Sequence, residues 1–95
     1  MSLNQLVSKY IASAEQVFRE VKITEIPLSL NPAEAEKVLG FAKAYLDDAK
    51  YYRNEKRFEV SLVSVAYCEG ILDALRLLGA VTFNWAKKNE ERNEK

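Results

Sequence analysis

Three charged residues on one apolar segment form the clearest candidate for a chemical site in this sequence. Glu69, Asp73 and Arg76 are spaced by four and then three residues, so a helix would carry all three on one face. Two carboxylates beside a guanidinium can form an ion pair, bind a small charged ligand, or act as acid and base if their environments differ. We expect an Asp73–Arg76 ion pair, with Glu69 partnered by a basic or hydroxyl group of another helix. A local pair, a buried polar network between helices and a ligand pocket stay open as interpretations.

The residue types on which most enzymes depend are missing from the rest of the chain. The sequence has no histidine and one cysteine, which removes the commonest general base and leaves too few ligands for a structural zinc site. The Glu-x-x-His pattern of di-iron bundles and the glycine-rich loops that bind phosphate are also absent. We therefore expect no catalytic residue, no cofactor and no metal. Fourteen basic and fourteen acidic residues cancel, so we expect no nucleic-acid partner either.

The aromatic residues follow the rhythm of a hydrophobic core. A base-stacking surface would instead expose aromatic rings between Lys and Arg. We expect a packed core with hydroxyl groups at its edge, formed by Tyr10, Phe41, Tyr45, Tyr52 and Tyr67. Cys68 should be buried or half-buried, with Glu69 beside it raising the pKa of its thiol. Gly70 should allow a neighbouring helix to approach closely, a ligand contact being the alternative.

Three heptad-like stripes of apolar residues predict three long helices. The polar break at 54–57 is short enough to make the second and third helices antiparallel neighbours. The longer connection at 23–31 carries more apolar surface than a solvated loop should, so we expect it to lie as a strap across the bundle. The fold class is therefore all-α, a small up-down antiparallel bundle without a β-sheet. The expected helices span residues 2–22, 32–54 and 58–78.

Residue types at the expected helix ends support these limits. Ser2 and Gln5 form a capping-box pattern at the first helix. Asn31 can cap the second helix, with Pro32 at its first position. Gly79 stands where a left-handed cap would end the third helix.

The third expected helix is apolar on almost every side, which normally means that protein surrounds it. We therefore place it at the centre of the assembly. One face carries Val60, Val63, Tyr67, Ile71, Ala74 and Leu78. The opposite face carries Phe58, Leu62, Val65, Ala66 and Leu72 beside the charged triplet.

Ninety-five residues are enough for one domain. We expect a helical bundle over 1–81 and a charged C-terminal tail over 82–95, frayed or forming a short helix. No apolar run approaches the roughly 18 residues of a membrane span, and the N-terminus lacks the pattern of a signal peptide. We therefore expect no membrane partner. A single cysteine fits a reducing compartment, so we expect a cytoplasmic location.

Two stretches of the chain resemble a known family. The first is Ala-Tyr-Leu-Asp-Asp-Ala-Lys-Tyr-Tyr at 44–52, and a polar turn to Phe58 leads on to the second, Val-Ala-Tyr-Cys-Glu-Gly-Ile-Leu-Asp-Ala-Leu-Arg-Leu-Leu-Gly at 65–79. Together they resemble the DUF357 family of short archaeal proteins, from the first helix to about Val81. The resemblance is sharpest at Tyr67, Gly70, Leu72, Asp73, Ala74 and Gly79. It implies a compact helical bundle of archaeal origin with no established activity.

The sequence favours a non-catalytic module for protein interaction or assembly. The reason is apolar surface beyond what one small bundle can hide, together with the missing catalytic groups. The alternative is a helper domain that binds a small ligand or nucleotide at Glu69, Asp73 and Arg76, and an enzyme that uses these carboxylates is a third class. We expect a homodimer with twofold symmetry, or another protein as partner. In the competing account, the strap and the Phe83–Trp85 segment complete the core and leave a monomer.

Overall fold

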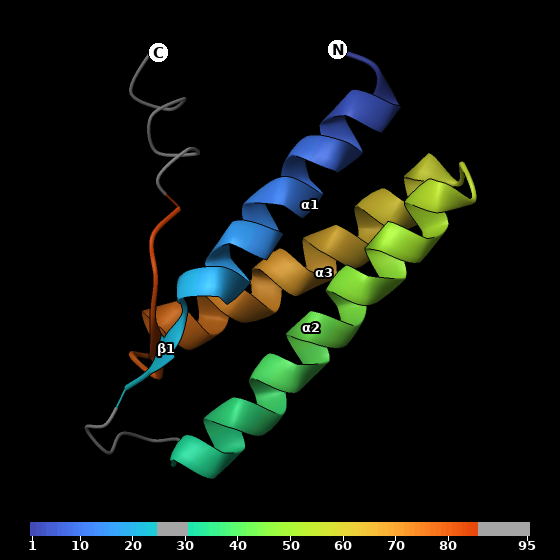
Figure 1. Cartoon of the computed structure of the whole chain (residues 1–95). Helices are drawn as coiled ribbons and strands as arrows, with labels where there is room; N and C mark the ends of the chain where they lie inside the picture. The colour runs from blue at the N-terminus through green and yellow to red at the C-terminus, as the bar shows by residue number, and fades with distance from the viewer. Residues whose placement is uncertain (25–30, 86–95) are drawn as a thin grey trace.

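The computed structural model describes residues 1–24 and 31–85. It contains three long helices, α1 (Leu3–Glu20), α2 (Pro32–Asn54) and α3 (Phe58–Leu77), and two short strands, β1 (Lys22–Ile23) and β2 (Val81–Thr82). Figure 1 shows that each helix runs antiparallel to the one that follows it. The predicted all-α up-down bundle is confirmed, and every predicted helix end lies within two residues of the observed one.

The predicted helix caps account for this agreement. Ser2 and Gln5 form a reciprocal capping box, with the Gln5 amide donating to Ser2 Oγ over 3.1 Å. At α2, the Glu34 amide donates to Asn31 Oδ1 over 2.8 Å, and Pro32 follows the cap. Gly79 has a φ of 77°, the left-handed conformation that glycine adopts without a steric penalty. Each cap satisfies backbone groups that the helix itself leaves without partners, and this fixes where the helix begins or ends.

Each helix contributes one buried stripe to the core, and the three stripes meet along the axis of the bundle. On α1 the stripe is Val7, Ile11, Ala14 and Val17, and on α2 it is Ala35, Ala42, Leu46 and Ala49. On α3 it is Ser61, Val65, Cys68, Leu72 and Leu75. The Ser61 hydroxyl donates to the carbonyl oxygen of Ala49 over 2.6 Å, which satisfies the one buried polar side chain of the described core.

The prediction that protein surrounds α3 is wrong for the described residues. Val63 and Tyr67, which we assigned to a buried face, are 57% and 59% exposed. Two neighbouring helices cover only the side of α3 that carries Val65 and Leu72. The reason is geometric, because a helix in a three-helix bundle touches two partners and keeps an outward side.

The prediction of a fold without a β-sheet is also wrong, in a minor respect. Strands β1 and β2 pair antiparallel, with Lys22 opposite Thr82 and Ile23 opposite Val81. The Thr24 amide extends the ladder by donating to the carbonyl oxygen of Ala80 over 2.9 Å. Ile23 therefore packs against a second apolar cluster at this end of the bundle, formed by Ala35, Leu75, Ala80 and Val81. The central part of the predicted strap, with Ile26 and Leu28, lies outside the described residues.

Residues 83–85, which follow β2, return along the bundle (Figure 1). Trp85 is buried, and Phe83 packs against the same core cluster, with the two rings edge to face at a centroid distance of 5.1 Å. These residues belong to the segment that we assigned to a tail, and the compact body extends at least as far as Trp85. Residues 86–95 lie outside the described part of the chain.

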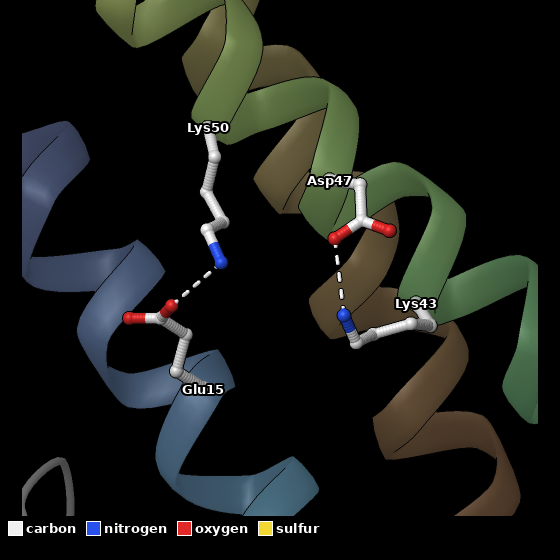
Figure 2. A network of polar contacts seen from close by, with 4 residues as sticks. All are labelled: Glu15, Lys43, Asp47 and Lys50. Atoms are coloured by element: carbon white, nitrogen blue, oxygen red, sulfur yellow. Dashed lines mark hydrogen bonds and ion pairs between the residues drawn. The ribbon is translucent and has the colours of Figure 1, made fainter.

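Polar contacts on the surface join α1 to α2. Figure 2 shows Lys50 reaching from α2 to Glu15 on α1, where Nζ and Oε2 are 2.9 Å apart. A second pair, Lys43 and Asp47, stays within α2 at 3.0 Å. The hydrogen bond from Lys50 is the main cause that lowers the pKa of Glu15, and partial burial opposes it. The Glu15–Lys50 contact therefore favours a charged carboxylate between the two helices.

Candidate functional site

The outward side of α3 is an open apolar groove. It has a volume of about 500 Å³ and is lined by Val63, Ala66, Tyr67, Gly70, Ile71 and Ala74. All six residues are uncharged, so the groove offers shape and apolar surface without a charged group. We call this feature the α3 groove.

Aromatic side chains of α2 and α3 form a wall beside the α3 groove. The ring of Tyr67 stacks on that of Tyr45 from α2, with centroids 5.3 Å apart and planes 20° apart. Phe41 lies one helical turn from Tyr45 on the same side of α2 and is 57% exposed. Tyr45 packs against the core as predicted, whereas the prediction that Phe41 and Tyr67 belong to a packed core is wrong.

Gly70 lies in the middle of the α3 groove. Apart from the local backbone of α3, a Cβ atom added at this position would meet no described atom within 4 Å, so neither α1 nor α2 approaches Gly70 closely. The prediction that Gly70 permits close packing is therefore wrong for contacts within the described part of the chain. The glycine leaves the floor of the groove low and open towards solvent.

The predicted polar triplet is on another side of α3, and none of its members lines the α3 groove. Arg76 and Asp73 form the predicted ion pair, with Nη2 and Oδ1 3.6 Å apart. Their side chains are 40% and 44% exposed, so this is the local, half-exposed form of the pair. Glu69, one turn earlier, is half-buried.

The C-terminal segment provides the other contacts of this triplet. Trp85 Nε1 donates a hydrogen bond to Asp73 Oδ1 over 2.5 Å. The guanidinium of Arg76 lies over the ring of Phe83, 5.9 Å from its centroid. Sequence reasoning missed both contacts because Asp73 and Trp85 are twelve residues apart and meet only after the chain turns at Gly79. Together they give Asp73 and Arg76 a structural task, which is to hold residues 83–85 against α3.

Cys68 is buried as predicted. Burial raises the pKa of its thiol to about 12, and the negative charge of Glu69 adds to the effect. The thiol is therefore neutral near pH 7, and a neutral thiol is a weak nucleophile and a weak metal ligand. Within the part of the chain that the structure describes, no group of three or more His, Cys, Asp or Glu side chains could hold a metal ion.

The α3 groove was missed because sequence alone did not reveal which side of α3 is buried. Four of its six residues were visible as one apolar face, namely Val63, Tyr67, Ile71 and Ala74, whereas Ala66 was assigned to a second apolar face with Val65 and Leu72. The exposure of Ala66 shows that this assignment is wrong. One signal could have separated the two faces, since Gly70 has no side chain with which to fill a core.

In the described ranges 1–24 and 31–85, no helix is both long enough and apolar enough to cross a membrane.

These features define a small three-helix bundle with an open apolar groove on α3 and a C-terminal segment held by Asp73 and Arg76. The family described as "Protein of unknown function (DUF357)" matches the chain over residues 9–81. The match covers all of α2 and α3, most of α1 and the start of β2, so the chain belongs to the DUF357 family. No curated protein and no solved structure matches the chain.

Proposed function

We propose that this protein is a non-catalytic module for protein interaction or assembly, and that its docking surface is the α3 groove. The observation that carries the proposal is the exposure of Val63 and Tyr67 among the six uncharged residues that line the α3 groove. Single exposed apolar side chains are normal on proteins, but a contiguous apolar patch points to an interaction site.

The energetics of apolar surface support this proposal. Burial of apolar surface stabilises a complex by roughly 25 cal/mol for each Å² removed from water. Val63 and Tyr67, one turn apart on α3, and Phe41 on the adjacent helix α2 each keep more than half of their surface exposed. Aromatic residues in such places are the side chains that contribute most to binding energy at protein interfaces.

The alternative, a small-ligand or nucleotide helper, has weaker support from the polar triplet. The oxygen Oδ1 of Asp73 is used by both Arg76 and Trp85. A ligand that took this oxygen would have to replace contacts that hold the C-terminal segment.

A cytoplasmic location belongs with our proposal, because the free thiol of Cys68 fits a reducing compartment.

A comparison of two tyrosines tests the docking surface. Tyr67 in the α3 groove and Tyr51 on α2 are almost equally exposed, at 59% and 60%, so Tyr51 is a matched control. A tyrosine-selective reagent followed by mass spectrometry measures the modification rate at each residue. We expect Tyr67 to become protected relative to Tyr51 when the protein is concentrated or placed in an extract of its own organism. Val63→Lys should remove this protection.

Equal modification of the two tyrosines under all these conditions would contradict the proposed function. Protection of Tyr67 that persists in Val63→Lys would also contradict it, because the protecting contact would then lie elsewhere.

A further inference from the structure

We propose that the partner in the α3 groove is the same groove of a second copy, so that two chains form a twofold dimer across α3. This inference rests on the proposed function, since it names the partner of the same docking surface. In the dimer, the two α3 helices run antiparallel and cross at Gly70.

The exposed residues of α3 are arranged symmetrically about Gly70. From Val63 to Leu77 the spacings are three, four, four and three residues, with alanines at 66 and 74. All five positions are exposed. A twofold axis at Gly70 would therefore place Val63 against Leu77 of the partner copy, and Ala66 against Ala74. Large side chains meet at both ends and small ones in the middle, which is the shape of a self-complementary contact.

The open floor at Gly70 agrees with this arrangement. Apart from the local backbone of α3, no described atom lies within 4 Å of a Cβ atom built there, so the contacts of the described residues do not require a glycine. Glycine inside a helix lowers the stability of that helix relative to alanine. A second helix that crosses α3 at Gly70 would fill the space that the missing side chain leaves.

Charges on α2 are complementary in the same dimer. Lys37, Phe41, Tyr45 and Asp48 follow at spacings of four, four and three, so they share one side of α2, beside the α3 groove. Because Tyr45 stacks on Tyr67 and the helices are antiparallel, residue 42 of α2 is level with Gly70. Lys37 is five residues before this level and Asp48 is six residues after it.

The twofold axis would therefore bring Lys37 of one copy to within about 2 Å of the level of Asp48 of the other, twice in the dimer. Both side chains are exposed, and neither pairs with another residue of the described part of the chain. Within one chain the two residues are eleven positions apart on α2, about 16 Å at 1.5 Å per residue, too far to pair. Their opposite charges make an attractive contact only between copies.

The face formed by α2 and α3 is large enough for a dimer. The 20 residues of α3 give a length of about 30 Å, and two adjacent helices are about 20 Å wide. The projected area of roughly 600 Å² has the same order as the roughly 800 Å² that each partner buries in a typical stable complex.

A charge-swap experiment tests this arrangement by sedimentation equilibrium. The wild-type chain should approach twice its mass of 10.8 kDa at high micromolar concentration. Lys37→Asp alone and Asp48→Lys alone should each weaken the dimer about threefold to tenfold, because each creates two like-charge contacts. An equimolar mixture of the two variants should form a heterodimer of at least wild-type affinity, since the mixture restores an attractive pair at both contacts.

Gly70→Lys and Gly40→Lys form the second pair of variants. Both glycines are exposed within helices and have open space around them, so both changes should leave the fold intact. Gly70→Lys should weaken the dimer at least tenfold. Gly40 lies about 140° round α2 from Tyr45 but only about 60° from Lys37, so Gly40→Lys should weaken association much less than Gly70→Lys.

Three results would overturn the inference. They are a wild-type mass of one chain over the whole concentration range, a mixture of charge variants that fails to recover the dimer, and equal effects of Gly70→Lys and Gly40→Lys. If the wild-type chain stays monomeric while an extract still protects Tyr67 and not Tyr51, the second copy is wrong and the proposed function stands. If neither concentration nor extract protects Tyr67, both fail.

Discussion

At the level of single residues, Asp73 does more than form the ion pair with Arg76 that its spacing predicts. Its carboxylate accepts a hydrogen bond from Trp85 and pairs with Arg76, while Arg76 covers the ring of Phe83. Each contact involves a half-exposed group, and such contacts contribute on the order of 1 kcal/mol or less. Their combined effect is positional, because they fix the segment after β2 on the surface of α3.

The Glu15–Lys50 contact predicts a pH dependence of stability. The pKa of Glu15 is lowered below its ordinary value of 4.5, mainly by the hydrogen bond from Lys50. A carboxyl group whose pKa is lower in the folded state stabilises the fold above its unfolded pKa and loses this effect as the pH falls through the folded pKa. In urea unfolding, Glu15→Gln should therefore be less stable than the wild type at pH 7, and the difference should shrink towards pH 3.

Asp47→Asn is the control for this prediction, since the Lys43–Asp47 pair stays within one helix and is more exposed. Its effect should be smaller at both pH values. A Glu15→Gln deficit as large at pH 3 as at pH 7 would mean that the charge of Glu15 contributes nothing.

The spacing of residues in the sequence predicted only those contacts of the site that join two residues of the same helix. Asp73 and Arg76 are three residues apart, so the helix alone brings them together. The contact of Asp73 with Trp85 depends on the path of the chain after Gly79, which local pattern does not encode. The burial of Cys68 was predictable from its place in an apolar segment.

At the level of elements, helix ends were predictable and the buried side of α3 was not. The ends depend on caps within a few residues, such as Ser2 with Gln5 and Asn31 with Glu34. The buried side depends on where two other helices pack, and α3 offered apolar residues all round. The β1–β2 ladder escaped prediction because two residues on each strand give no periodic signal.

The segment 81–85 should contribute to stability as an element of its own. Trp85→Ala removes a buried aromatic ring from the core cluster and should cost about 3 kcal/mol of unfolding free energy. Trp85→Phe keeps most of the packing and loses the hydrogen bond to Asp73, so it should cost less. Asp73→Ala should cost about 1 kcal/mol, because its contacts are half-exposed. Urea unfolding followed by far-UV circular dichroism measures all three.

A double-mutant cycle separates the hydrogen bond from the packing. Trp85→Phe and Asp73→Ala together should cost less than the sum of the single changes, with a coupling energy of about 0.5–1.5 kcal/mol. Strict additivity would show that the contact between Trp85 and Asp73 contributes nothing to the stability of the fold.

At the scale of the whole molecule, the single helix α3 contributes both to the core and to an exposed apolar face. The core stripe of α3 contains Val65 and Leu72, and its outward side contains Val63 and the other residues of the α3 groove. A chain of 95 residues buries only about 60–65% of its unfolded surface, so a large share of its apolar surface stays outside the core. The division between the two sides can be tested separately from any partner.

Two valines, two positions apart, provide that test. Val63 is 57% exposed and Val65 is 1% exposed, so the same substitution at each site separates surface from core. Val65→Lys would place an ammonium group in the core without a partner, at a cost on the order of 5 kcal/mol, enough to unfold a domain of this size. Val63→Lys should change the unfolding free energy by no more than about 0.5 kcal/mol when measured at a concentration too low for association. A loss of several kcal/mol in Val63→Lys under these conditions would mean that the outward side of α3 is covered within the chain, and the α3 groove would then not be a free surface.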